Sequence, residues 1–507
     1  MRARKQKSQK AATILSARQE RYRHLTHDMQ PQALFSDDKI AALHDAALRG
    51  LEELGIAFAL PEAREIFAKA GAKISDEMVY IGRDIVKEAL ANCHKEITLK
   101  APNPLYDKAY HQTSLLFTPA GGCPNVSDAI RGRRPGDAQS YSEAVKLTQM
   151  LEVLHVQSVA PEPQDIPIHL RHLFMAQTQL SQCDKIISLY ARGRGQLMQS
   201  FELIKTALNV DDESFQANPH AITIVNSNSP RLFDKPMAQA LIDFAHHGQL
   251  SVITPFCLAG AMAPVTIEGA MILQHMECLA GITLAQLAKS GAPVSYGGFG
   301  SNVDMRSGSP AFGTPEHIKM QILSGQLARH IGLPWRSAAG SASNLGDAQG
   351  NLENTNALWG AVLGNANLVL HAAGWLEGGL TFGFEKFITD IEALQIIAEM
   401  TSGTEPDKIE DAYQAISDTA PAGHFFDNPH TMTRFKDAFY PPFNADLSNF
   451  GTWQANGAQS ADMRATAKWQ ALLEAYQPPQ EAGIRQDRMT PLLDEFHNLG
   501  GAMPLDG

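Results

Sequence analysis

Short apolar runs alternate along the middle of the chain with longer segments of helical periodicity, and each of eight such runs is followed by a helical pattern. The predicted strands are 115–118, 153–159, 185–190, 221–225, 250–254, 293–297, 333–338 and 367–371. The predicted helices are 139–151, 166–182, 195–208, 234–247, 266–289, 315–331, 353–365 and 385–401. Helix start signals support the pattern, as where Thr314 precedes Pro315 and Glu316.

Eight strands that are each followed by a helix predict an α/β fold, a (β/α)₈ TIM barrel over residues 114–403. A doubly wound sheet is the alternative. It would favour fewer strands and a glycine fingerprint in the first strand-to-helix turn. That turn is Pro119-Ala120-Gly121-Gly122-Cys123, which is not such a fingerprint. The pattern therefore favours the barrel.

The two flanks of the barrel have a different organisation. Residues 28–113 predict an N-terminal helical cap, and residues 404–507 predict a C-terminal helical extension. Residues 1–27 contain eight Lys or Arg and a single Glu. We expect this basic arm to be solvated or to clasp another subunit. A targeting segment is the alternative, but no apolar stretch follows the basic residues.

Composition narrows the classes of function. The net charge of −12 argues against general nucleic-acid binding. No run approaches the roughly 18 apolar residues that a membrane helix needs. The five cysteines are scattered and odd in number, which indicates reduced thiols and a cytoplasmic protein. No convincing set of metal ligands is present, because His275 and Cys278 stand without partner ligands and are better explained by core packing.

Residues 293–385 hold the strongest functional signal. Three strands there give way to loops rich in Gly, Ser and Asn that carry isolated charged and aromatic residues. In a barrel, chemistry occurs at the carboxyl ends of the strands. Tyr296, Phe299 and Trp375 could form a box for a quaternary ammonium group, with Asp304 or Glu377 nearby, although each aromatic residue alone is better explained as core.

Other polar residues of these loops leave alternatives open. Arg306 could bind a carboxylate or pair with a neighbouring acid. His371 could contact a ligand or be a buried structural histidine. Gln349 could bind substrate or cap the following helix. No Walker loop, dinucleotide fingerprint or nucleophile elbow is present.

Several motifs, in the same order, resemble the trimethylamine methyltransferase family. They are Asn228-Ser229-Pro230, Ala263-Pro264-Val265-Thr266, Asp304-Met305-Arg306-Ser307-Gly308, Asp347-Ala348-Gln349, Leu376-Glu377-Gly378-Gly379-Leu380-Thr381-Phe382, Gly423-His424-Phe425-Phe426, Pro429-His430-Thr431 and Ala467-Lys468-Trp469. The resemblance covers nearly the whole chain beyond the basic arm. It implies a barrel that moves a methyl group from an amine to the cobalt of a corrinoid, carried on a separate small protein.

The founding members of that family contain pyrrolysine, which we expect to align near residues 340–343. This chain has Gly340-Ser341-Ala342-Ser343 there. It therefore resembles the non-pyrrolysine branch, whose characterised members demethylate glycine betaine and related quaternary amines. The resemblance implies a small quaternary-amine substrate, a cobalamin-type corrinoid as methyl acceptor, a corrinoid protein as partner and no bound metal. We also expect a homo-oligomer.

The resemblance and the loop positions together suggest roles for individual residues. Asp304, Glu377 and His371 are the candidate catalytic residues. Substrate binding is assigned to Tyr296, Phe299, Trp375 and Phe382 around the cationic head, and to Arg306, Asn226 or Gln349, with His371, around the carboxylate. Contact with the corrin is assigned to Gly297, Gly298, Gly340, Ser341, Asp347 and Gly374.

Two other classes of function remain open at this point. One is a barrel lyase or hydrolase that uses Asp304, Asp347 and Glu377 as acid–base groups or metal ligands. The other is a non-catalytic protein that binds betaine.

Overall fold

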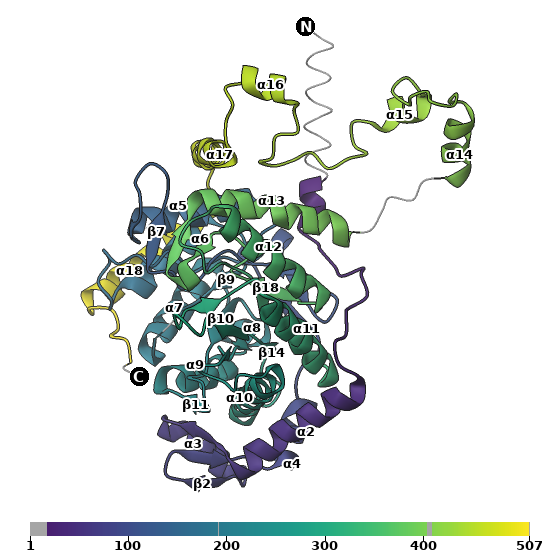
Figure 1. Ribbon diagram of the computed structural model, residues 1–507. Coiled ribbons are helices and arrows are strands. Elements are labelled where there is room, and N and C mark those ends of the chain that lie inside the picture. The colour runs from purple at the N-terminus through teal and green to yellow at the C-terminus, as the bar shows by residue number, and fades with distance from the viewer. Residues whose placement is uncertain (1–17, 191, 403–407, 506–507) are drawn as a thin grey trace.

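The computed structural model describes residues 18–190, 192–402 and 408–505. Its centre is a parallel sheet surrounded by helices (Figure 1). In hydrogen-bonded order the strands are β6 (Leu116–Phe117), β18 (Leu368–Leu370), β17 (Trp335–Ala338), β14 (Val294–Gly297), β12 (Leu250–Ile253), β10 (Ala221–Val225) and β9 (Ile187–Ser188).

Residues 153–159 occupy the eighth position and close the sheet into a ring. The backbone N–H of His155 donates to the carbonyl of Phe117 at 2.9 Å, and that of Gln157 donates to Ile186 at 2.9 Å. These bonds connect the β6 end of the sheet to the β9 end. The predicted TIM barrel is therefore confirmed, and the doubly wound sheet is wrong because such a sheet would stay open.

The barrel helices follow the strands in the expected alternation. They are α5 (Ala138–Met150), α6 (Arg171–Gln182), α7 (Arg194–Leu208), α8 (Asp212–Ala217), α9 (Lys235–His246), α10 (Ile267–Ala288), α11 (Pro315–His330), α12 (Ala348–Leu363) and α13 (Phe384–Thr401). Side chains of Asp137, Thr266, Thr314 and Asp347 cap α5, α10, α11 and α12 by accepting from backbone N–H groups of the first turn.

Strand β17 shows which side chains enter the barrel. Trp335 and Ser337 face outward: Trp335 Nε1 donates to the carbonyl of Asn365 at 2.8 Å, and the Ser337 hydroxyl accepts from Gln321 at 3.1 Å. Successive side chains of a strand point to opposite faces. Arg336 therefore points into the barrel, where it is only 1% exposed.

An antiparallel hairpin closes the amino-terminal end of the barrel. Its strands are β4 (Ile97–Leu99) and β5 (Lys108–Tyr110), with the short helix η1 (Pro104–Tyr106) between them. The Tyr110 hydroxyl is 2.6 Å from the Ser295 hydroxyl of β14. The hairpin shares one apolar cluster with interior side chains, among them Leu116, Val156, Ile186, Ile222, Leu250, Val252, Leu368 and Leu370. The floor of the barrel is thus packed.

The N-terminal segment 28–113, predicted as a helical cap, contains the helices α2 (Asp37–Glu53), α3 (Pro61–Lys69) and α4 (Arg83–Ala91). It also contains β1 (Ile56–Phe58), β2 (Lys73–Ser75) and β3 (Met78–Tyr80), which form a small sheet with β11 (Leu232–Phe233) of the barrel. Sequence analysis missed these strands because three residues are too few to show a period.

The C-terminal extension contains α14 (Ile409–Ser417), α15 (Pro429–Arg434), α16 (Phe450–Ala455), α17 (Ala461–Ala475) and α18 (Ala482–Asn498). Helix α17 packs on α13, and α18 packs on α6 and α7, whereas α14 to α16 project from the body (Figure 1). Most of the predicted basic arm, residues 1–17, lies outside the described residues. Among the described helices, none has the length and apolar character that a membrane crossing requires.

Candidate active site

Four rings meet at the carboxyl ends of β14 and β18. Phe299 follows β14, Phe312 follows the β15 (Ser301–Val303) and β16 (Pro310–Ala311) hairpin, and His371 and Trp375 follow β18. The Phe299 ring lies 5.2 Å from Phe312, 5.7 Å from Trp375 and 5.6 Å from His371, centre to centre. Figure 1 places β14 and β18 near the centre of the ring of helices. The cluster therefore lies over the barrel interior.

His371 is held in one orientation and one protonation state. Its ring stacks on Trp375 with centres 4.6 Å apart, and its Nδ1 accepts from the backbone N–H of Gly121 at 3.2 Å. Burial, and then the charge of Arg336, hold the pKa of His371 well below its ordinary value. The imidazole is consequently neutral with its proton on Nε2, which makes Nε2 a hydrogen-bond donor.

Arg336 places a cation directly beneath this cluster. Its guanidinium carbon lies 5.3 Å from the centre of the Phe299 ring. Within the described chain, its buried Nε and Nη1 have no hydrogen-bond partner. Burial lowers the pKa of Arg336 to about 9, so the group is still charged at neutral pH. A buried cation without a counter-ion is costly, and an anionic ligand would relieve that cost.

Arg336 and Phe312 are functional candidates that sequence analysis missed. Arg336 stands inside the predicted strand 333–338, among mainly apolar and small residues. The sequence did hold one signal for Arg336. It is a charged residue directly after Trp335, and successive side chains of a strand point to opposite faces. Phe312 follows a long hairpin, and no local pattern in the sequence showed that this hairpin returns to the mouth.

The loop after β17 is held by Glu353 of α12. Glu353 accepts from the Ser341 hydroxyl at 2.6 Å and from the backbone N–H groups of residues 342 and 343. The backbone of Gly340 has φ +110°, and a Cβ there would lie 2.1 Å from Trp375. Gly340 is therefore needed for the close approach of the indole.

A second buried pair supports the loop after β18. Lys386 and Asp390 of α13 form an ion pair, and Asp390 also accepts from the backbone N–H of Gly374 at 2.9 Å. Both side chains are buried. Side chains of α12 and α13 thus hold the two loops that surround the aromatic cluster.

Asp304 and Arg306 lie away from the cluster, between β15 and β16. Asp304 is exposed and accepts from Ser307 and from the backbone N–H of Arg306, which lowers its pKa. Arg306 is also exposed. The structure explains Asp304 by a hairpin turn and gives it no contact with the aromatic rings.

Glu377 is likewise engaged locally. It follows β19 (Trp375–Leu376) in the short helix η2 (Glu377–Gly379), before β20 (Thr381–Gly383). Both of its carboxylate oxygens accept from Arg133, at 2.8 and 2.9 Å, and this pairing lowers its pKa.

Asp347 caps α12, and Gln349 donates to Glu353 at 2.8 Å. Asp304, Asp347 and Glu377 are thus each engaged by neighbours of their own.

Tyr296, Phe382 and Asn226 have three different environments. The Tyr296 hydroxyl is 3.1 Å from His275 on α10, so its ring faces the helices instead of the barrel interior. Phe382 is fully buried against Phe384 and Phe387. Asn226, at the end of β10, is exposed at the mouth. Of the predicted aromatic residues, Phe299 and Trp375 are in ring contact, and Phe382 stands opposite Trp375 in the β19–β20 pair.

The glycines assigned to corrin contact are explained by internal packing. A Cβ at Gly297 would lie 2.2 Å from Thr254, one at Gly298 would lie 2.8 Å from Gln274, and one at Gly374 would lie 3.2 Å from Phe382. As at Gly340, the neighbouring space is filled by the chain itself. Internal packing accounts for these glycines, and their contact with a corrin stays a prediction.

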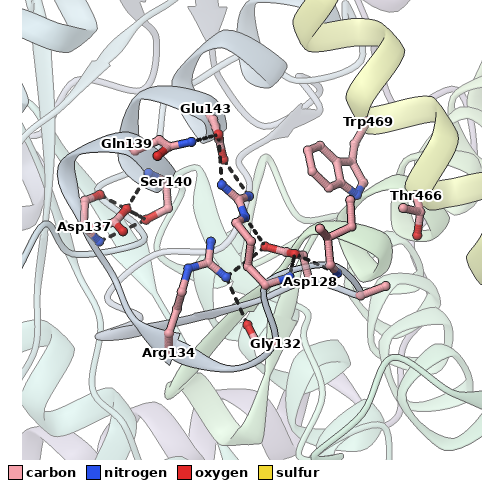
Figure 2. A network of polar contacts seen from close by, with 12 residues as sticks. Asp128, Gly132, Arg134, Asp137, Gln139, Ser140, Glu143, Thr466 and Trp469 are labelled. Atoms are coloured by element: carbon pink, nitrogen blue, oxygen red, sulfur yellow. Dashed lines mark hydrogen bonds and ion pairs between the residues drawn. The ribbon is translucent and has the colours of Figure 1, made fainter.

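The loop after β6 is stiffened by a charged network (Figure 2). It contains the β7 (Asn125–Ser127) and β8 (Arg134–Pro135) hairpin. Asp128 accepts from Arg131 and Arg134, and Arg131 also forms two bonds to Glu143 of α5. The Arg131 guanidinium lies 5.6 Å from the ring of Trp469 on α17. The network joins this part of the rim to α5 and α17.

The loops at the mouth also carry exposed apolar side chains. They come from the β7–β8 hairpin, from the β13 (Leu258–Ala259) to α10 loop, from the β15–β16 hairpin, and from the loops after β17 and β18. These side chains, 54% to 72% exposed, are Ile130, Val265, Met305, Leu345 and Leu380.

Among the described residues, no group of three or more His, Cys, Asp or Glu is placed to hold a metal ion.

The chain is similar to several known proteins. The family model described as trimethylamine methyltransferase (MTTB) matches residues 1–492. A glycine betaine methyltransferase of Desulfitobacterium hafniense (strain Y51) is 34% identical over 448 residues, covering 88% of this chain and 93% of that protein. A proline betaine:corrinoid methyltransferase of Eubacterium limosum is 25% identical over 409 residues, covering 76% and 81%.

More distant similarity extends to other amine methyltransferases. Trimethylamine methyltransferase MttB of Desulfitobacterium hafniense (strain DSM 10664 / DCB-2) is 24% identical over 448 residues, covering 88% of this chain and 90% of that protein. The crystal structure of Methanosarcina barkeri monomethylamine methyltransferase aligns with a TM-score of 0.48 at 11% identity, covering 91% and 88%.

Proposed function

Because this chain belongs to the trimethylamine methyltransferase family, we propose that it transfers a methyl group from a carboxylated quaternary amine, a betaine such as glycine betaine, to the cobalt of a corrinoid. The observation that carries the proposal is the unpaired Arg336 cation, 5.3 Å from the centre of the Phe299 ring, which itself contacts the Phe312 and Trp375 rings. A betaine joins a cationic head to a carboxylate, and this site offers a complementary group for each.

The aromatic rings suit the cationic head. A quaternary ammonium cannot donate hydrogen bonds, so the negative faces of aromatic rings are the usual means of holding it. Phe299, Phe312 and Trp375 are each less than 8% exposed, so contact with them removes the head from water and strengthens the attraction.

The carboxylate is assigned to Arg336, with His371 Nε2–H as a second donor. Guanidinium binds carboxylate through parallel, charge-assisted hydrogen bonds. The distance of 5.3 Å between the Arg336 guanidinium carbon and the Phe299 ring suits a molecule whose two charges are separated by a single methylene group. Arg336 thus replaces the exposed Arg306 in the predicted role.

The reaction requires little acid–base chemistry from the protein. Co(I) supplies the electron pair that forms the new bond to the methyl carbon. The C–N bond breaks, its electron pair stays on nitrogen, and the amine leaves as a neutral tertiary amine without taking up a proton. The task of the site is to fix the donor so that one N-methyl group faces the mouth. This agrees with a cluster that contains no carboxylate poised as a general acid.

The corrinoid is assigned to a separate partner protein that docks over the mouth. The exposed apolar side chains of the rim, Ile130, Val265, Met305, Leu345 and Leu380, support a surface that another molecule covers. All five cysteines are free and buried, which supports a reducing compartment such as the cytoplasm.

Incubation of the protein with Co(I) cobalamin and a panel of amines tests the proposal. We expect the absorbance of methylcobalamin to appear with glycine betaine and to be absent with trimethylamine. Choline serves as a matched quaternary amine without a carboxylate and should react at least about tenfold more slowly. Failure of every betaine in the panel to yield methylcobalamin would rule the function out.

A further inference from the structure

The segment from α14 to α16 forms an arm that is apolar on its outside. Helix α14 places Ile409, Tyr413 and Ile416 at the spacing of one helical face, and these side chains are 83%, 67% and 63% exposed. A soluble helix normally buries such a face. The large apolar side chains of the arm that are at least half exposed include Ile409, Tyr413, Ile416, Phe426, Met432, Phe435, Phe439, Leu447 and Phe450.

The arm has internal order of its own. Asn428, at the start of α15, donates to the carbonyl of Ala415 in α14 at 3.2 Å and accepts from the backbone N–H of His430 at 2.9 Å. Ala415 and Asn428 are buried, whereas the bulky side chains point outward. The exposed apolar face is therefore presented by a folded unit.

The base of the arm is fixed to the barrel. Glu392 of α13 accepts from the backbone N–H groups of Phe443, Asn444 and Ala445, at 2.8, 2.8 and 2.5 Å. Arg18 donates to the carbonyl of Phe439 at 3.0 Å. These bonds hold the base against the body, while Figure 1 shows α14 and α15 standing clear of it.

We propose that this arm packs against a second copy of the chain in a symmetric homodimer. Each exposed aromatic or branched side chain would bury on the order of 100–150 Å² or more, so one arm offers about 1,000 Å² of apolar surface. Two exchanged arms would thus bury an area typical of permanent homodimers.

Two features favour a second copy over the protein that carries the corrinoid. The corrinoid carrier must dock and leave in each catalytic cycle, and transient interfaces are smaller and more polar. In addition, α13, which precedes the arm, exposes Ile396 and Met400 on its own surface, 42% and 53%. In a dimer with a two-fold axis, both subunits would contribute the same two patches to the interface, the arm and the exposed surface of α13.

Sedimentation velocity of the wild type at micromolar concentration and of the double variant Tyr413→Ser/Ile416→Ser tests the proposal. We expect a dimer for the wild type and a monomer for the variant. Leu499→Ser is the matched control, because Leu499 is 69% exposed on the C-terminal side of α18, outside the arm, and this variant should remain dimeric. Unchanged circular dichroism and melting of the double variant establish that the barrel is folded.

Limited trypsin digestion supplies a second measure that needs no substitution. Cleavage after Lys436 should slow as the concentration of the wild type rises, since dimerisation covers the arm. A monomeric wild type, or a double variant that stays dimeric, would overturn the proposal. Protection of the arm that appears only when a corrinoid protein is added would also overturn it, in favour of that partner.

Discussion

The guanidinium carbon of Arg336 lies 5.3 Å from the centre of the Phe299 ring, and no carboxylate of the described chain forms an ion pair with it. This pair is an unusual element of a barrel interior, because a buried charge is normally neutralised. It is the physical basis for assigning the carboxylate of the substrate to Arg336 and the cationic head to the rings above.

Replacing Arg336 by methionine should lower the activity without lowering the stability. We expect kcat/KM for glycine betaine to fall by about 100-fold, since a buried, charge-assisted contact is lost. The free energy of unfolding of the unliganded protein should stay the same or rise by about 1 kcal/mol, because an unpaired buried charge has been removed. Steady-state kinetics and urea titration measure the two quantities. A large loss of stability would show that Arg336 has a structural role instead.

The same residue predicts the alkaline limb of the pH profile. Arg336 has a pKa of about 9 in the free protein, lowered by burial, and only its protonated form binds a carboxylate. We expect kcat/KM to fall about tenfold per pH unit above that value. Since the folded pKa is below the unfolded one, stability from this group rises with pH over the same range, so deprotonation of Arg336 does not itself unfold the protein. The residual activity of Arg336→Met should lack this limb.

Phe299→Leu should weaken recognition of the ammonium group. The leucine keeps apolar contact but loses the negative ring face, so the Kd for glycine betaine should rise by about tenfold. The Kd for 3,3-dimethylbutyrate, a carboxylate of the same shape whose tert-butyl head is uncharged, should change by about twofold at most. Calorimetric titration gives both values. Phe382→Leu is the control, since Phe382 packs on Phe384 and Phe387, and it should leave the ratio of the two Kd values unchanged.

Glu377→Gln tests a predicted catalytic residue. The carboxylate is bound by Arg133 at a partly exposed position, so we expect kcat/KM to change by no more than about threefold. Arg133→Gln should have an equally small effect. A loss of about 100-fold in Glu377→Gln alone would restore a direct role in catalysis for this residue.

Gly340→Ala should be far more damaging than its size suggests. The new Cβ would lie 2.1 Å from the Trp375 ring on a backbone with φ +110°, so both packing and conformation are strained. We expect a loss of about 3 kcal/mol in the free energy of unfolding and a change in tryptophan fluorescence. Gly71→Ala is the matched control: φ is +89° there, but nothing lies within 4 Å of the added Cβ. A stable Gly340→Ala with unchanged fluorescence would contradict the packing argument.

The sequence predicted the barrel well because its strands and helices repeat with clear periods. It also predicted the mouth, and Phe299, Trp375 and His371 do meet there. It failed where a residue's position depends on a long loop. The turn that Asp304 caps carries Arg306 away from the rings, and Arg133 engages Glu377 from a hairpin 244 residues earlier. Arg336 was missed because periodicity shows which face a side chain occupies only when the partner elements are known.

The packed floor of the barrel has a consequence for the order of events in turnover. Tyr110 and the β4–β5 hairpin fill the amino-terminal end, so the methyl donor and the corrinoid reach the rings from the same side. A docked corrinoid protein would cover the path of the small molecule. The donor should therefore load first and the demethylated amine should leave last, which gives compulsory-order kinetics. An excess of corrinoid protein should then inhibit the enzyme by docking before the donor has entered.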